Sequence, residues 1–282
     1  MLISFSTQAQ NLFVSDVGNG DIYQFTPSGV PSTFASGLQP GGLAFNSVGN
    51  LFVGDYGGNI YEFTPGGVQG TFASGLSMPF ALAFSSAGNL FEADYTSGKI
   101  NEFTPGGVES TFASGLSTPY ALAFNSSGDL FEADYSSGTI YEFTPGGAQS
   151  TFASGLEEPL GLAFNNAGNL FVSNLGNSTI TEITPGGVKT TFASGLLSPI
   201  GLAFDSTGDL FVSVQGNGSI DEFTPSGVKS TFASGITSMT ELAFQGETLP
   251  VPEPSALGLL AVGAIALLAR RRNLDHVRAH SA

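Results

Sequence analysis

The chain has 282 residues, of which 41% are hydrophobic and only 11% are charged. This composition excludes a disordered chain, which would have more charge and fewer large apolar side chains. Residues 1–250 contain three basic and 21 acidic residues, a net charge of −18, so we expect no binding to nucleic acid, because an acidic surface repels phosphates. The absence of cysteine excludes disulfides and cysteine-ligated metal sites.

Residues 1–10, MLISFSTQAQ, form a lead-in to the first regular element. A secretory signal peptide has a basic start followed by an apolar run, and this segment has neither. The C-terminal residues 252–272, with a Pro-Glu-Pro motif, an apolar stretch and three arginines, predict export. We therefore expect that a signal peptide is missing from the start of the chain. The alternative is that this chain is not exported.

Residues 11–246 consist of six repeats of about forty residues. One marker, Thr-Phe-Ala-Ser-Gly, recurs at intervals of 38 and then 40 residues, and a second marker, Asn/Asp-Leu-Phe, recurs with it. The unit from Pro119 to Glu158 contains four short apolar runs separated by Ser-Ser-Gly and Pro-Gly-Gly. These runs are too short for helices, and the separators are typical of turns. Four strands per forty-residue unit predict an all-β, six-bladed β-propeller of four-stranded blades.

The order of the markers predicts how the ring closes. A Leu-Ala-Phe strand precedes the Leu-Phe strand in every unit except the first, and one copy stands alone at the end. We therefore expect Leu242–Phe244 to supply the innermost strand of the first blade, which removes an exposed sheet edge. In the alternative, Leu2–Phe5 takes that place.

The repeat pattern Pro-x-(Gly/Ala)-Leu-Ala-Phe, Gly-(Asn/Asp)-Leu-Phe and Gly-x-Ile-x-Glu-Phe-Thr-Pro-x-Gly resembles the NHL repeat over residues 11–246. It is also similar to the SMP-30-like gluconolactonases and the streptogramin B lyases, whose fold hosts enzymes and binding proteins alike. The lyase resemblance implies a histidine base, but the only histidines, His276 and His280, lie beyond the repeats. The gluconolactonase resemblance implies a divalent metal held by Glu, Asn and Asp from several blades.

Carboxylates recur at the end of the second strand of successive units, at Asp16, Asp55, Asp94 and Asp134. A ring of such groups around a channel could bind Ca²⁺ or a cationic ligand. In the alternative, each Asp accepts hydrogen bonds from its own turn, and the repetition favours this role.

Glu92 and Glu132 occupy positions where other units have valine. A carboxylate in place of an apolar strand residue needs a partner or water. The two residues, in adjacent blades beside Asp94 and Asp134, are the best local candidate for a metal or polar-ligand site. Duplication of one tolerated substitution is the competing explanation.

Aromatic residues accompany the carboxylates. Tyr56, Tyr95 and Tyr135 follow three of the Asp residues, and Phe80 and Tyr120 follow the prolines that enter the first strand of a unit. Aromatic rings beside carboxylates suit carbohydrate binding. Packing between blades is the alternative, and we favour it.

The C-terminal part is a linker, an anchor and a tail. Residues 247–254 form a linker that ends in Pro252-Glu253-Pro254, residues 255–272 form an apolar stretch followed by Arg270, Arg271 and Arg272, and residues 273–282 are polar. The fifteen uncharged residues 255–269 predict a short hydrophobic helix of about 22 Å. Such a helix can make a thin or temporary membrane span, with the arginines on the cytoplasmic side.

This three-part tail resembles the PEP-CTERM sorting signal. The resemblance implies processing by an exosortase-type enzyme and delivery to the cell envelope, the surface or the extracellular matrix. We therefore expect an exported, non-enzymatic binding or structural propeller, with extracellular polysaccharide as the ligand to test first. The alternative is a metal-dependent lactonase-like or hydrolase-like enzyme that uses the acidic rim.

Overall fold

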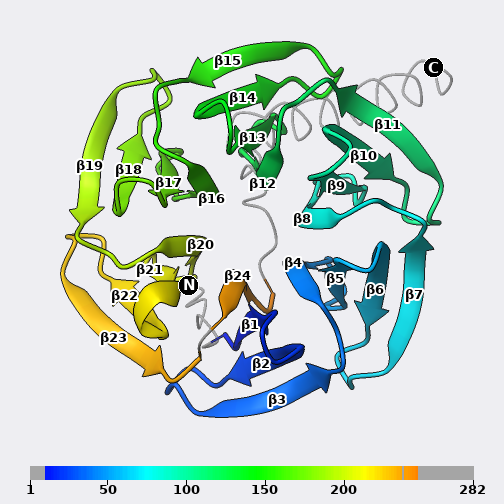
Figure 1. The fold of residues 1–282 in the computed structure, drawn as a ribbon, viewed down its shortest axis with the longest axis horizontal. Coiled ribbons are helices and arrows are strands. Elements are labelled where there is room, and N and C mark those ends of the chain that lie inside the picture. The colour runs from blue at the N-terminus through cyan, green and yellow to red at the C-terminus, as the bar shows by residue number, and fades with distance from the viewer. Residues whose placement is uncertain (1–9, 237, 247–282) are drawn as a thin grey trace, which may run out of the picture. The chain divides into compact units, whose positions relative to one another are not determined.

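The computed structural model describes residues 10–236 and 238–246. These residues form six four-stranded antiparallel sheets arranged around a central axis (Figure 1). The predicted six-bladed propeller is confirmed. The innermost strands are β4, β8, β12, β16, β20 and β24, and the outermost are β3, β7, β11, β15, β19 and β23.

The strands have the following bounds, given blade by blade from the innermost strand outward. Blade 1 comprises β24 (Met239–Phe244), β1 (Leu12–Asp16), β2 (Asp21–Phe25) and β3 (Pro31–Ser36); blade 2 comprises β4 (Pro40–Phe45), β5 (Leu51–Asp55), β6 (Asn59–Phe63) and β7 (Gln69–Ser74). Blade 3 comprises β8 (Pro79–Phe84), β9 (Leu90–Asp94), β10 (Lys99–Phe103) and β11 (Glu109–Ser114); blade 4 comprises β12 (Pro119–Phe124), β13 (Leu130–Asp134), β14 (Thr139–Phe143) and β15 (Gln149–Ala153). Blade 5 comprises β16 (Pro159–Phe164), β17 (Leu170–Asn174), β18 (Thr179–Ile183) and β19 (Lys189–Ser194); blade 6 comprises β20 (Pro199–Phe204), β21 (Leu210–Val214), the 3-10 turn η1 (Gln215–Asn217), β22 (Ser219–Phe223) and β23 (Lys229–Ser234).

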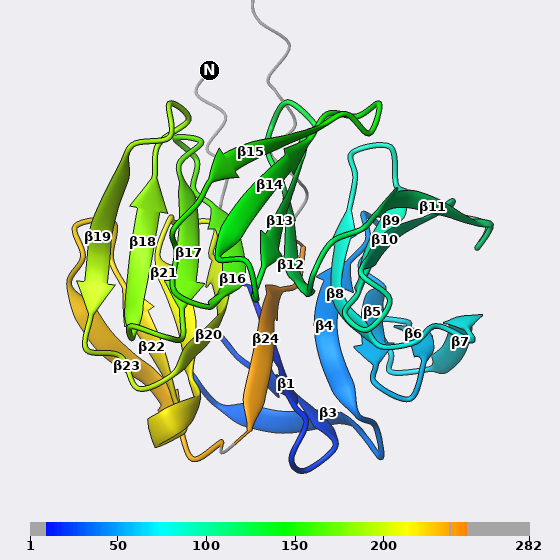
Figure 2. The same ribbon diagram turned by 45° about the horizontal axis from the view of Figure 1, so that its top comes forward.

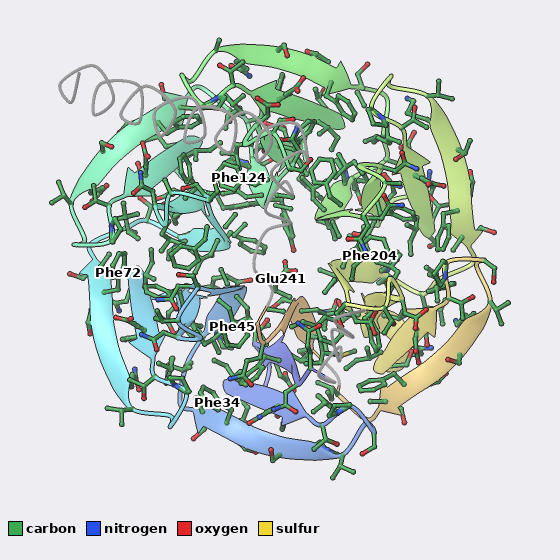
Figure 3. The ribbon with its side chains drawn as sticks, turned by 180° about the vertical axis from the view of Figure 1, so that it is seen from behind. Phe34, Phe45, Phe72, Phe124, Phe204 and Glu241 are labelled. Carbon is green, nitrogen blue, oxygen red and sulfur yellow. The ribbon has the colours of Figure 1, made fainter. Side chains whose placement is uncertain are left out.

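Phenylalanine rings fill the interfaces between blades. Phe131 on β13 meets Phe152 on the outermost strand of its own blade and Phe164 on the innermost strand of the next, in each case edge to face at 4.9 Å between ring centroids. The same pair of contacts recurs in every interface, including the one from Phe211 in blade 6 to Phe244 in blade 1. Edge-to-face geometry suits the charge distribution of aromatic rings. The repeated Phe residues therefore stabilise contacts between blades, and Figure 3 labels five of them in different parts of the ring.

The ring is closed by the last described strand. β24 pairs with β1 in antiparallel register, with Leu12 opposite Phe244 and Val14 opposite Leu242. Figure 2 shows β24 between β20 and β4, the innermost strands of its neighbours. The prediction that Leu242–Phe244 completes the first blade is confirmed. The alternative segment, Leu2–Phe5, lies outside the described residues.

The chain divides into two units, and the second, Pro250–Ala282, lies outside the described residues. The expected hydrophobic helix within 255–272 belongs to it. Among the described residues, no helix has the length and apolar character that a membrane span requires.

Candidate functional site

The loops that carry the predicted site residues meet at one rim of the propeller. Pro79 and Pro119, at the start of two innermost strands, lie opposite Asp94 and Asp134 at the end of the adjacent strands. The backbone N–H of Tyr135 donates to the carbonyl oxygen of Thr118 at 3.0 Å, and the equivalent bond recurs in blade 3. The loop after each second strand thus lies against the loop entering the innermost strand. We call this rim the binding face.

The repeated aspartates hold these two loops together. Asp134 accepts hydrogen bonds from the backbone N–H of Ser117 at 2.7 Å and of Ser137 at 3.0 Å, one from each loop. Asp55 and Asp94 bridge the same two loops in their blades, whereas Asp16 accepts from its own turn. Such contacts satisfy buried backbone donors. These hydrogen bonds explain why Asp recurs at this position. Binding of an ion by the same residues remains a prediction.

Glu92 and Glu132 lie in different interfaces between blades. Strand residues alternate between faces, so Glu92 is on the same face of its sheet as Leu90, which packs against blade 2, and Glu132 is on the same face as Leu130, which packs against blade 3. Both side chains are fully buried. The sheet of blade 3 therefore stands between the two carboxyl groups. Within the described residues, no three His, Asp or Glu side chains gather as a metal site would require.

The two buried carboxyl groups differ in their partners. The side-chain amide of Asn101 donates to Oε2 of Glu92 at 3.0 Å, while neither carboxyl oxygen of Glu132 has a hydrogen-bond partner. Burial raises the pKa of Glu92 to about 8, and burial together with the nearby Asp134 raises the pKa of Glu132 well above its ordinary value. Both groups are accordingly expected to be protonated in the folded protein at neutral pH.

The five aromatic residues form a continuous arc across blades 2, 3 and 4. The ring of Tyr56 stacks on Phe80 with centroids 5.0 Å apart and planes within 17° of each other. The centroid of the Phe80 ring is 4.0 Å from that of Tyr120 and 5.5 Å from that of Tyr95. The centroids of Tyr120 and Tyr135 are 5.9 Å apart. All five side chains are partly exposed. We call Tyr56, Phe80, Tyr95, Tyr120 and Tyr135 the aromatic arc.

The aromatic arc breaks the symmetry of the repeat. At the positions of Phe80 and Tyr120, blades 5 and 6 carry Leu160 and Ile200. Blade 2 has Gly41 there, where an added Cβ would come within 3 Å of the ring of Tyr56. Glycine at this position therefore leaves the space that the Tyr56 ring occupies against Phe80. The arc is one localised surface, not a sixfold feature of the fold.

A further residue, Glu241, joins this face and was missed from the sequence. It lies on β24, and Figure 3 shows it near the centre of the ring. Its carboxylate is half-buried and accepts a hydrogen bond from the N–H of Leu242 at 3.2 Å. Burial raises the pKa of Glu241 to about 7, partly offset by this bond. Burial raises the pKa of Tyr56 and of Tyr120, and the negative charge of Glu241 raises both further. The carboxylate therefore influences two rings of the aromatic arc electrostatically.

A signal for Glu241 was available in the alignment of the repeats. The other five innermost strands have only glycine or alanine at its position, at Gly42, Ala81, Ala121, Gly161 and Gly201.

Residues 250–272 match the family model of the PEP-CTERM protein-sorting motif. The chain carries a PEP-CTERM sorting signal. This signal indicates export with sorting to the cell envelope or surface, and it implies an exosortase-type processing enzyme as a partner. A search of curated protein sequences finds no match to the chain.

Several solved structures share the propeller fold. Virginiamycin B lyase from Staphylococcus aureus is 16% identical, with a TM-score of 0.64 over 84% of this chain and 88% of the lyase. A gluconolactonase from Xanthomonas campestris is 15% identical, with a TM-score of 0.68 over 83% of this chain and 88% of the enzyme. One chain of a nidogen/laminin complex is 17% identical, with a TM-score of 0.77 over 85% of the present chain and 100% of the nidogen/laminin chain. At such identities the likeness shows the fold alone.

Proposed function

We propose that this protein is a surface-sorted binding module that engages extracellular polysaccharide through the aromatic arc. The observation that carries this proposal is the arc itself, five touching and partly exposed rings confined to blades 2–4. Apolar surface that is exposed in one place marks interaction sites, and tyrosine combines an apolar face with a polar edge. The proposed role is non-enzymatic.

The chemistry of the arc suits a sugar chain. Aromatic faces stack on the apolar faces of sugar rings, and the tyrosine hydroxyls at the ring edges can exchange hydrogen bonds with sugar hydroxyls. The five rings span three consecutive blades, which provides contacts for more than one sugar unit. Transient membrane anchoring by 255–272, followed by release to the surface or matrix, would bring this face to external polysaccharide.

The proposal is tested on a glycan array with the purified propeller and two matched variants. Tyr120→Leu introduces the residue type that blade 5 carries at Leu160, and we expect it to reduce glycan binding about tenfold or more, because the central ring of the arc is lost. Tyr141→Thr introduces the residue type of Thr181 at a tyrosine outside the arc, and should leave glycan binding unchanged. Equal loss in both variants, or no glycan binding by the wild type, would refute the proposal.

The same preparation tests the enzymatic alternative. A lactonase-like enzyme would turn over lactones in the presence of a divalent metal and lose that activity in Asp94→Ala. Because Asp94 bridges two loops through its backbone hydrogen bonds, thermal unfolding of the variant must accompany the assay. Metal-dependent turnover that is lost while the fold persists would replace the binding proposal with the enzymatic one.

The surface destination is tested in the native host. Fractionation of cells with and without their exosortase should show the propeller at the surface or in the matrix only when the enzyme is present. The same distribution in both strains would contradict the assignment of Pro252, Glu253 and Pro254 as its recognition motif.

A further inference from the structure

Glu241 is the one carboxylate at its position among the six innermost strands. The other five have glycine or alanine there, and the reason is close contact between strands. An added Cβ at Gly201 would lie 2.6 Å from the carbonyl oxygen of Thr240, and one at Gly42 would lie 2.7 Å from that of Phe80. A large side chain is therefore excluded at those two positions by backbone of the next blade.

The neighbour of Glu241 is the start of β4, which lacks side chains. The hydroxyl of Thr240, the residue before Glu241, lies 3.4 Å from the carbonyl oxygen of Pro40, so the two strands lie against each other at this point. β4 continues with Gly41 and Gly42, and the ring of Tyr56 covers Gly41. The carboxylate of Glu241 is thus next to the first ring of the aromatic arc, consistent with its effect on the pKa of Tyr56.

No basic side chain of the described residues lies at this carboxylate. The described part of the chain has three lysines: Lys229 forms an ion pair with Asp221, Lys189 donates to the carbonyl oxygen of Ser154, and Lys99 is on β10, two strands outward from the innermost strand of blade 3. A half-buried carboxylate without a cation is costly when ionised. Since no lysine of the described residues supplies a positive charge here, a bound cationic ligand would offset this cost.

We propose that Glu241 and the aromatic arc together bind the ammonium group of a cationic saccharide. Aromatic faces attract cations through their negative π-surface, and a carboxylate beside them adds an ion pair in a partly desolvated setting. Aromatic rings that surround the cation are the usual arrangement for binding quaternary ammonium ligands. The inference rests on the proposed function, because it assigns the ligand chemistry of the same face.

The test compares a permanent cation with a neutral molecule of the same shape. Choline and its uncharged isostere 3,3-dimethyl-1-butanol are titrated into the wild type, Glu241→Gln and Glu241→Gly, with chemical shifts of the tyrosine ring protons as the readout. We expect the wild type to bind choline about tenfold more tightly than the alcohol, a preference that both variants lose. Glu241→Gly has the residue of the equivalent strands, so at least one variant is expected to fold, and thermal unfolding verifies it.

Each outcome decides between the two proposals. Equal affinity of the wild type for choline and the alcohol overturns the inference, and so does a preference for choline that survives in a folded Glu241 variant. If glycan binding is still lost in Tyr120→Leu, the proposed function stands while the ammonium assignment falls. If choline is preferred and no glycan binds, the cation site stands and the saccharide assignment falls.

Discussion

Asp134 shows how a single side chain can hold the binding face in place. Its two carboxyl oxygens accept backbone hydrogen bonds from the loop before β12 and from the turn after β13. Removing this carboxylate leaves buried backbone N–H groups without an acceptor, which lowers the stability of the fold. This role explains the repetition of Asp in a way that needs no ligand.

We predict that Asp134→Ala lowers the free energy of unfolding by about 2–4 kcal/mol, since three charge-assisted hydrogen bonds are lost. Urea unfolding followed by circular dichroism measures the change. The control is Asp129→Ala, because the side chain of Asp129 accepts one hydrogen bond, from the partly buried side chain of Asn125. Equal destabilisation by the two substitutions would contradict the bridging role of Asp134.

The sequence allowed the members of the site to be predicted, but not their arrangement. The rim position of Tyr95 and Tyr135 follows from their place after a strand, as does that of the Asp residues. The stacking of Tyr56 on Phe80 depends on the space left by Gly41, which no local pattern shows. The contrast of Glu241 with the glycine and alanine of the other repeats could have been seen in the sequence, but not its position beside β4, because β4 is some 200 residues away in the chain and becomes adjacent only when the ring closes.

At the scale of single strands, β9 and β13 each contain a carboxyl group where the other blades have valine. Because Glu92 and Glu132 belong to adjacent repeats, the sequence pointed to them as one candidate site. The alternation of side chains across a sheet instead places them in separate interfaces, each surrounded by apolar residues. These groups are a source of pH dependence in stability.

We predict that the wild type loses stability as the pH rises and that Glu132→Val removes part of this loss. In the unfolded chain a glutamate ionises near pH 4.5, whereas in the folded chain the raised pKa keeps it protonated to higher pH. The contribution of each such group to stability is therefore greatest below about pH 4.5 and falls by about 1.4 kcal/mol per pH unit until the group ionises in the folded state. For Glu92 that decline ends near pH 8.

Urea unfolding at pH 5 and pH 8 tests this prediction. Glu132→Val is the cleaner variant, because Glu92→Val would leave the amide of Asn101 without its partner. The difference in free energy of unfolding between the two pH values should be smaller in Glu132→Val than in the wild type and unchanged in Glu157→Gln, an exposed control. A wild type and Glu132→Val that respond identically to pH would show that Glu132 is ionised in the fold.

The interfaces between blades provide a second prediction at this scale. Phe131→Ala removes two edge-to-face contacts, one within its blade and one to blade 5. We expect it to lower the free energy of unfolding by about 3–5 kcal/mol, and Phe131→Leu to lower it clearly less, since leucine fills more of the cavity. Thermal unfolding of both variants and the wild type measures which substitution destabilises the protein more. A change below about 1 kcal/mol for alanine would contradict the packing described here.

For the whole molecule, the period of forty residues and the four apolar runs per unit were enough to predict the six blades. The strand count also predicted that β24 completes blade 1, because one Leu-Ala-Phe strand was left over. The sequence did not indicate that closure brings Glu241 against β4 and the aromatic arc. The proposed binding face is thus a property of the closed ring.

Closure of the ring by β24 is the central claim, and two-probe unfolding tests it most directly. All seven tyrosines belong to blades 1–4, so tyrosine fluorescence follows those blades, while far-ultraviolet circular dichroism follows all six. A closed ring predicts coincident urea transitions for the wild type, and a lower midpoint for a chain that lacks residues 239–246. Separate transitions in the wild type, or an unchanged midpoint in the shortened chain, would contradict the account.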